Sequence, residues 1–104
     1  MAVATVVRFA INPGKNQEFM ALAAEAKKIH ERLGGKVRIW NATLAGPDSG
    51  NVSYVIEHAN IAAYASFSDK MGADAEWLKF VPKAFSANPA GRALSSVLIT
   101  EATM

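Results

Sequence analysis

The hydrophobic positions along the chain predict a strand followed by a long amphipathic helix. Residues 2–11 are almost all apolar or β-branched, which is typical of a strand covered on both faces. Apolar residues then recur at helical spacing on one face, namely Phe19, Leu22, Ala23, Ala26, Ile29, His30 and Leu33. We expect Asn12 to cap this helix with Pro13 at its first position, and Gly34-Gly35 to end it.

The stretch from Lys36 to His58 has the pattern of two strands joined by a turn. Residues 37–44 and 51–57 are rich in β-branched and aromatic residues, and Gly46 to Gly50 between them is dense in turn-forming residues. Matching the side chains by parity predicts the pairs Asn41–Tyr54, Ile39–Ile56, Arg38–Glu57 and Trp40–Val55. A slip by two residues would keep the faces and change the pairs.

Two further helices and a strand complete the pattern. Asn60 can cap a helix with Ile61, Tyr64, Phe67 and Met71 on one face, which Gly72 is expected to stop. Asp74 can cap the next helix, whose apolar stripe includes Trp77 and Phe80 and which Pro82 is expected to kink or end. The last strand is expected from about Arg92 to Thr103, with apolar residues on both faces.

This order predicts an α+β protein of the ferredoxin-like type, β-α-β-β-α-α-β, forming one domain over residues 1–104. Right-handed crossovers place the first and third strands in the centre of a four-stranded antiparallel sheet, with the helices on one face. Because every strand carries apolar side chains on both faces, the uncovered face would expose a large apolar patch. We therefore expect a homodimer.

Composition excludes several classes of function. The net charge of +2 comes from basic and acidic residues that are interleaved along the chain, which does not indicate a nucleic-acid site, and the chain has no cysteine for disulfides or thiolate zinc ligands. No metal-ligand spacing, phosphate-binding loop or nucleophile elbow is present. Neither a signal peptide nor a membrane span is evident, so the expected location is cytoplasmic.

With this element order, the chain resembles the dimeric α+β barrel superfamily, which includes antibiotic-biosynthesis-type monooxygenases, NIPSNAP-like proteins, muconolactone isomerases and haem-degrading enzymes. The features that carry the resemblance are the apolar first strand, Asn12-Pro13-Gly14-Lys15 with Glu18-Phe19, the central hairpin and Asp74-Ala75-Glu76-Trp77. It implies that two sheets close face to face and that each subunit can hold a small organic ligand between its sheet and helices. The asparagine, tryptophan and histidine set of the haem-degrading and monooxygenase branches is not matched, and we predict no cofactor.

Three polar side chains are candidates for the ligand site. His30 lies on the apolar face of the first predicted helix, near its C-terminus, where the helix dipole favours the charged form of the imidazole. It is either an acid, base or hydrogen-bond donor facing a ligand, or a buried histidine bonded to a carbonyl. Tyr54 and Asn41 share the helix-facing side of the hairpin and either contact a ligand or bond to each other at the edge of the core. His58 is expected to be a strand-end residue.

Aromatic and charged positions supply the remaining candidates. Phe67 and Trp77 either contact a planar ligand or belong to the core, as do Tyr64 and Phe80. The residues expected at a dimer interface are Arg8, Arg38, Trp40 and Glu57, because they share the other side of the strands. Alternatively, Arg38 and Glu57 form a solvent-exposed cross-strand pair without a role at an interface.

Two functions fit these residues. The first is binding or transformation of a small aromatic or polyketide-like molecule by an oxygenase or isomerase, with His30 and Tyr54 as candidate catalytic groups. The second is a non-catalytic dimeric ligand-binding or scaffold protein of the same fold. An RNA-recognition module, with Phe9 and Tyr54 stacking on bases, is disfavoured because the basic residues do not cluster near them.

Overall fold

The structure is a computed structural model that describes residues 1–43, 50–86 and 89–102. Its elements follow the predicted order: β1 (Val3–Ile11), α1 (Asn16–Arg32), β2 (Lys36–Asn41), β3 (Val52–His58), α2 (Ile61–Ala73), α3 (Ala75–Ala84) and β4 (Gly91–Thr100). The strands form an antiparallel sheet in the order β2-β3-β1-β4, so the predicted central positions of the first and third strands are confirmed.

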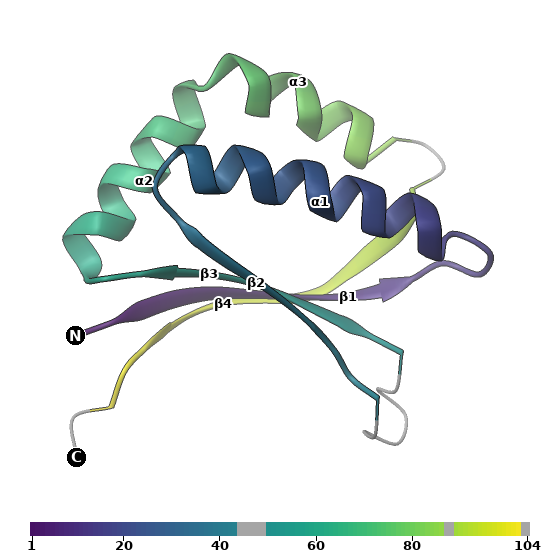
Figure 1. Ribbon diagram of the computed structural model, residues 1–104, viewed down its shortest axis with the longest axis horizontal. Helices are drawn as coiled ribbons and strands as arrows, with labels where there is room; N and C mark the ends of the chain where they lie inside the picture. The colour runs from purple at the N-terminus through teal and green to yellow at the C-terminus, as the bar shows by residue number, and fades with distance from the viewer. Residues whose placement is uncertain (44–49, 87–88, 103–104) are drawn as a thin grey trace.

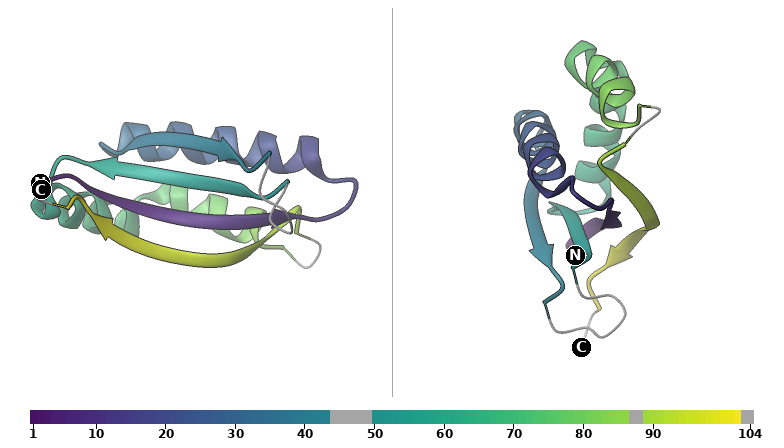
Figure 2. Two further views of the ribbon diagram at one scale, coloured as in Figure 1. Left: turned by 90° about the horizontal axis from the view of Figure 1, so that it is seen from below. Right: turned by 90° about the vertical axis from the view of Figure 1, so that its right-hand side faces the viewer.

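All three helices lie on one face of the sheet (Figures 1 and 2). In the two views of Figure 2, α1 lies on the β2 side of the sheet and α3 on the β4 side. The predicted α+β, ferredoxin-like fold is confirmed. None of the helices in the described part of the chain is both long and apolar enough to span a membrane.

Most of the predicted helix boundaries are correct. Gly34, which follows α1, has φ +105°, a conformation that glycine adopts without strain. Asn60 and Asp74 cap α2 and α3 by accepting hydrogen bonds from the backbone N–H groups of Ala63 (2.8 Å) and Trp77 (2.9 Å). Pro82 lies inside α3, which ends two residues later at Ala84.

The predicted start of α1 at Asn12 is wrong. Gly14, at φ +77°, places residues 12–15 in a turn in which the Lys15 N–H donates to the Asn12 carbonyl at 3.1 Å. The helix begins at Asn16 without a side-chain cap. The Asn12 amide instead donates to the Pro89 carbonyl at 2.7 Å, so Asn12 joins the first turn to the segment before β4. The last strand ends at Thr100, and the predicted end at Thr103 lies outside the described residues, as do Leu44 and most of the predicted Gly46–Gly50 turn.

The predicted hairpin register is wrong by two residues, although the predicted faces are correct. The structure pairs Ile39 with Tyr54, Arg38 with Val55 and Asn41 with Val52. The register was predicted by matching similar side chains across the two strands. Single cross-strand pairs contribute only about 0.2–1 kcal/mol, so this matching cannot distinguish two registers that differ by two residues and keep every side chain on the same face. Arg38 and Glu57 still form an ion pair, Nε to Oε2 at 3.0 Å, but diagonally.

The helix-covered face of the sheet carries the core. Alternate residues of β3 are buried against the helices, and the same alternation turns Ser53, Val55 and Glu57 to the open face. The α1 side chains that were predicted to share one apolar face are buried, apart from the partly buried Leu22. The buried core residues on this side are Phe19, Ala23, Ala26, Ile29, Leu33, Val37, Val52, Tyr54, Ile56, Phe67, Phe80 and Ala90.

Candidate functional site

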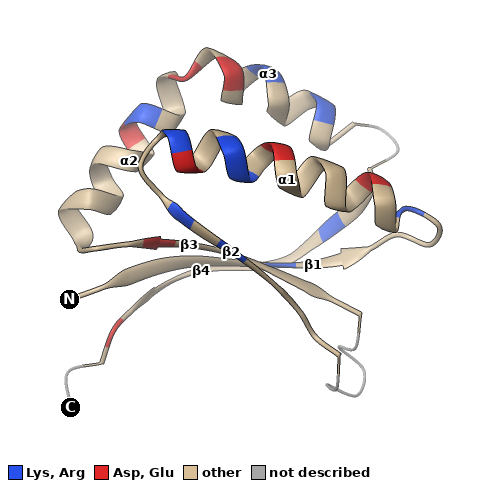
Figure 3. Ribbon diagram, viewed as in Figure 1, with Lys and Arg blue, Asp and Glu red and all other residues tan. Residues whose placement is uncertain are grey.

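A cavity of about 340 Å³ lies between the helices and the sheet. Its walls come from the three helices, the central strands and β4, and no lysine, arginine, aspartate or glutamate is among its described lining residues. Figure 3 shows that lysine, arginine, aspartate and glutamate are frequent along α1 and α3, and that only a few of them lie along the strands. The lining is Thr5, Val7, Phe9, Phe19, Leu22, Ala23, Ala26, His30, Tyr54, Ile56, Met71, Trp77, Phe80, Ala84, Phe85, Ala90, Gly91, Ala93 and Ser96.

Small residues leave room for this cavity. Ala23 and Ala26 occupy positions on the inner face of α1 where larger side chains would fill the space, and Gly91 and Ala93 do the same on β4. A Cβ atom at Gly91 would lie 2.7 Å from the ring of Phe19, so a larger residue at this position would require that ring to move. The run of small residues on an otherwise apolar face is the sequence signal for the cavity.

His30 and Tyr54 form the main polar pair in the cavity wall. Nδ1 of His30 lies 2.7 Å from the hydroxyl of Tyr54, and both side chains are buried, at 4% and 7% exposed. Nε2 of His30 is buried and has no hydrogen-bond partner among the described residues. This histidine is therefore bonded to a phenol, not to a carbonyl, and its second ring nitrogen is buried without a partner among the described residues.

Aromatic rings surround His30 and exclude water from it. Its ring centroid lies 4.4 Å from that of Trp77, 5.6 Å from Phe67 and 5.6 Å from Tyr54. Burial lowers the pKa of His30 to about 4. The helix dipole favours a charged imidazole at this position by about 0.3–1 kcal/mol, but desolvation is the larger effect and keeps His30 neutral near pH 7.

Tyr54 is also held in its neutral form. Burial, followed by the nearby charge of Glu31, raises its pKa above the usual value of 10.0. Near neutral pH the pair is thus an uncharged imidazole hydrogen-bonded to an uncharged phenol. Such a pair can donate to or accept from an uncharged polar group on a ligand, and it offers no charge to an anion.

The structure brings together only some of the predicted site residues. His30, Tyr54 and Trp77 line the cavity. Phe67 is buried behind His30 but is not part of the lining, and Asn41 is exposed at the end of β2, opposite Val52. The predicted Asn41–Tyr54 contact belonged to the incorrect register and does not form.

Two polar lining residues were not predicted. Thr5 and Ser96 lie on the helix-facing sides of β1 and β4 and contribute hydroxyl groups to the wall. The signal for Thr5 was its parity with Val7 and Phe9. Among the described residues, no three side chains of histidine, cysteine, aspartate or glutamate gather in a way that would hold a metal ion.

The four predicted interface residues point to the open face of the sheet. Trp40, Ser53, Arg8 and Ser95 make one row across the four strands, and Arg38, Val55, Val6 and Val97 make the next. The row after that is Lys36, Glu57, Ala4 and Ile99. Several large apolar side chains stay exposed here, including Trp40 at 56% and Val97 at 49%.

Comparison with solved structures shows that the chain has the α+β fold of NIPSNAP-type proteins. An uncharacterized NIPSNAP domain protein from Burkholderia xenovorans matches with a TM-score of 0.72 and 18% identity, over 98% of this chain and 95% of the other. A NIPSNAP family protein from Agrobacterium tumefaciens matches with a TM-score of 0.70 and 20% identity, over 94% and 82% of the two chains.

A candidate antibiotic biosynthesis monooxygenase from Bordetella bronchiseptica also matches, with a TM-score of 0.61 and 17% identity over 98% of both chains. No family model and no curated protein matches the sequence. The resemblance predicted from the sequence is confirmed at the level of the fold.

Proposed function

We propose that the protein binds a small uncharged aromatic or polyketide-like molecule in the cavity between sheet and helices, and that it acts on this molecule as an oxygenase or isomerase. The observation that carries this proposal is a cavity of about 340 Å³ that is almost wholly apolar and has the His30–Tyr54 pair in its wall. Ligand sites are typically concave and apolar with a few polar groups that fix orientation, and volumes of about 300–1,000 Å³ are usual. The candidate antibiotic biosynthesis monooxygenase from Bordetella bronchiseptica has the same fold, which supports oxygenation as one form of this transformation.

The absence of charge among the described lining residues favours an uncharged ligand. A buried carboxylate without a partner is strongly unfavourable, and neither His30 nor Tyr54 carries a charge to offset it at neutral pH. The Trp77 and Phe80 rings, stacked with centroids 5.4 Å apart and planes at 12°, present an aromatic wall against which a planar ligand can pack.

A thermal-shift screen tests this proposal. The probes are aromatic metabolites and flavins, with 2-naphthol and 2-naphthoate as a matched pair that share a ring system and differ in charge. We expect 2-naphthol to raise the melting temperature more than 2-naphthoate does. The effect of any stabilising ligand should fall in Tyr54→Phe and His30→Ala, and persist in Asn41→Ala, which lies outside the cavity. Equal effects in all three variants would place binding elsewhere.

A non-catalytic binding protein is the second candidate, and the low pKa of His30 favours it. A general base is most effective when its pKa lies near the working pH, and an imidazole with a pKa of about 4 is a weak base at pH 7. Incubating a stabilising ligand with the protein in air, followed by chromatography and mass measurement, separates the two. A product whose formation requires His30 and Tyr54 supports an enzyme, and unchanged ligand supports binding alone.

We also propose that the functional form is a homodimer that buries the open face of the sheet. Monomers rarely expose large apolar patches. On the open face, Trp40, Val97 and Ile99 are exposed on the two edge strands, and Val55 and Val6 lie between these edges in the row of Val97. Light scattering should give twice the chain mass at micromolar concentration. Val97→Glu should then yield monomers, whereas Leu78→Glu, at a site on α3 that is 55% exposed, should not.

A further inference from the structure

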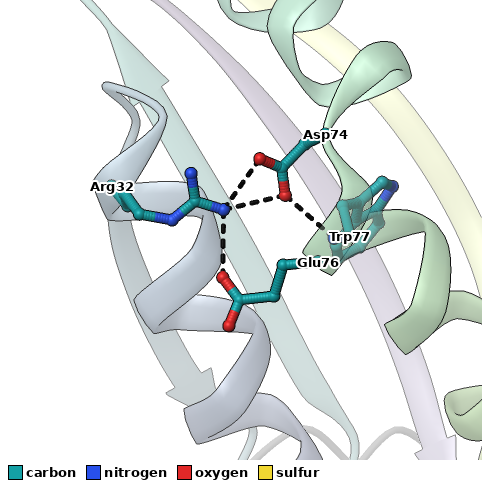
Figure 4. A network of polar contacts seen from close by, with 4 residues as sticks. All are labelled: Arg32, Asp74, Glu76 and Trp77. Carbon is teal, nitrogen blue, oxygen red and sulfur yellow. Dashed lines mark hydrogen bonds and ion pairs between the residues drawn. The ribbon is translucent and has the colours of Figure 1, made fainter.

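Two contacts join the end of α1 to the start of α3. Arg32, the last residue of α1, donates from Nη2 to both carboxylate oxygens of Asp74, at 2.9 and 2.8 Å, and to Oε1 of Glu76 at 3.0 Å (Figure 4). Two residues earlier in α1, His30 packs against Trp77. The ion pairs lie on the solvent side of the junction, and the aromatic contact lies on the cavity side.

Asp74 connects these two contacts. Its Oδ2 accepts from Arg32 and also from the backbone N–H of Trp77, at 2.9 Å, which is the capping bond of α3. The hydrogen bond from Arg32, followed by that from Trp77, lowers the pKa of the Asp74 carboxyl. One carboxylate thus ties the backbone of Trp77 to the end of α1 that carries His30.

A second ion pair offers an internal comparison. Lys83 donates to Glu25 at 2.7 Å and joins the other end of α3 to the middle of α1, with both side chains about half exposed, at 58% and 42%. The Asp74 side chain is only 14% exposed. Because exposed pairs are screened by water and salt, the lower exposure of Asp74 makes the Arg32–Asp74 pair the less screened of the two, although the Arg32 side chain is itself 49% exposed.

We propose that Arg32 and Asp74 are positioning residues, whose ion pair holds Trp77 against His30 and keeps water out of that end of the cavity. The inference rests on the proposed function, because it concerns the same cavity, but its effects are measured on Trp77 and His30 themselves. Movement of Trp77 away from His30 would hydrate the imidazole and remove the cause of its lowered pKa. The helix pair would then control both access to the cavity and the protonation of its histidine.

The test uses the full chain with Trp40→Phe as the parent. The sequence has two tryptophans, so Trp77 is the one that remains in this parent. Arg32→Gln and Asp74→Asn each break the ion pair, and asparagine preserves the cap of α3 because it is as good a capping residue as aspartate. In both variants we expect the pKa of His30, measured by NMR titration, to rise by about one unit or more towards its usual value. Trp77 emission should shift to the red and be quenched more strongly by acrylamide.

Two controls accompany these variants. Glu25→Gln breaks the second tie and should leave His30 and Trp77 as in the parent. His58, a buried histidine outside the cavity lining, serves as a reference within each sample, and its titration should not move.

Unchanged His30 titration and Trp77 quenching in folded Arg32→Gln would overturn the inference. Arg32→Gln alone is sufficient to test the inference if Asp74→Asn fails to fold, because the Arg32 side chain is 49% exposed and its replacement leaves the core intact. The proposed function fails separately. A shifted His30 with no stabilising ligand in any variant would refute ligand binding alone, and a ligand that stabilises Arg32→Gln with unchanged His30 would refute the positioning role alone.

Discussion

The two faces of the sheet both carry apolar side chains and differ in the state of their polar groups. On the helix-covered face, Tyr54 and His30 are buried, uncharged and bonded to each other. On the open face, Arg38 and Glu57 are exposed, charged and paired at 3.0 Å. The difference shows that burial beneath the helices keeps a polar group neutral, whereas a group on the open face of the monomer can keep its charge because water reaches it.

The largest expected difference between the faces comes from removing one aromatic ring from each. Phe67 is 4% exposed and contacts His30 and His58, so Phe67→Ala leaves a hole in the core. We expect it to lower the free energy of unfolding by about 3–5 kcal/mol. Trp40→Ala, at a side chain 56% exposed, should cost far less in the monomer. Urea unfolding at low protein concentration measures both, and equal losses would contradict the assignment of faces.

Acid should destabilise the helix-covered face next most strongly. The pKa of His30 is lowered to about 4 by burial and that of buried His58 is also lowered, so between pH 6.5 and 4 the unfolded chain binds more protons than the folded one. The free energy of unfolding therefore falls as the pH drops through this window, by about 2 kcal/mol for His30 alone.

Urea midpoints at pH 7 and pH 4 measure this loss. Because carboxylates also titrate in the same range, the control is the double variant His30→Phe/Tyr54→Phe, which removes the imidazole together with its phenol partner. The double variant should lose less stability on acidification than the wild type. An identical loss would mean that His30 does not cause it.

The sequence predicted the direction of side chains along the hairpin strands correctly, and it predicted the residue pairs between these strands incorrectly. Alternation along β3 was enough to direct Tyr54 inwards and Glu57 outwards, because side-chain direction is a property of the strand itself. The partner of Asn41 was predicted incorrectly because register depends on small differences between pairings of equal parity.

The chemistry of the site depends on tertiary packing, which the sequence pattern does not give. His30 was identified from its place on the apolar face of α1, but its bond to Tyr54 and its low pKa depend on how α1 and β3 pack together. The position of Trp77 over His30 depends on an ion pair between residues 42 positions apart in the sequence. No local pattern reveals such a pair.

Neighbouring residues of β3 provide a finer comparison of the faces. Tyr54→Phe removes the hydroxyl that bonds to His30 and leaves a buried ring nitrogen without its partner, at an expected cost of about 1–2 kcal/mol. In the monomer, at low protein concentration, Ser53→Ala, one residue away on the open face, should change stability by about 0.5 kcal/mol or less. Thermal and urea unfolding of the two variants measure the contrast. A cost at Ser53 as large as that at Tyr54 would indicate that the open face is buried in solution.

The smallest expected effect is the coupling between Arg38 and Glu57, and it reports on whether the open face is covered. As an exposed pair it should contribute about 0.2–1 kcal/mol in a double-mutant cycle of Arg38→Ala, Glu57→Ala and the double variant, and this value should fall in high salt. Burial against a second copy would desolvate both charges, which makes truncation of either one more costly and the coupling less sensitive to salt. The cycle should therefore be run below and above the concentration at which the chain dimerises. A coupling that is small and salt-sensitive at both concentrations would contradict the proposed dimer, because it would show that water reaches this pair in every state of the protein.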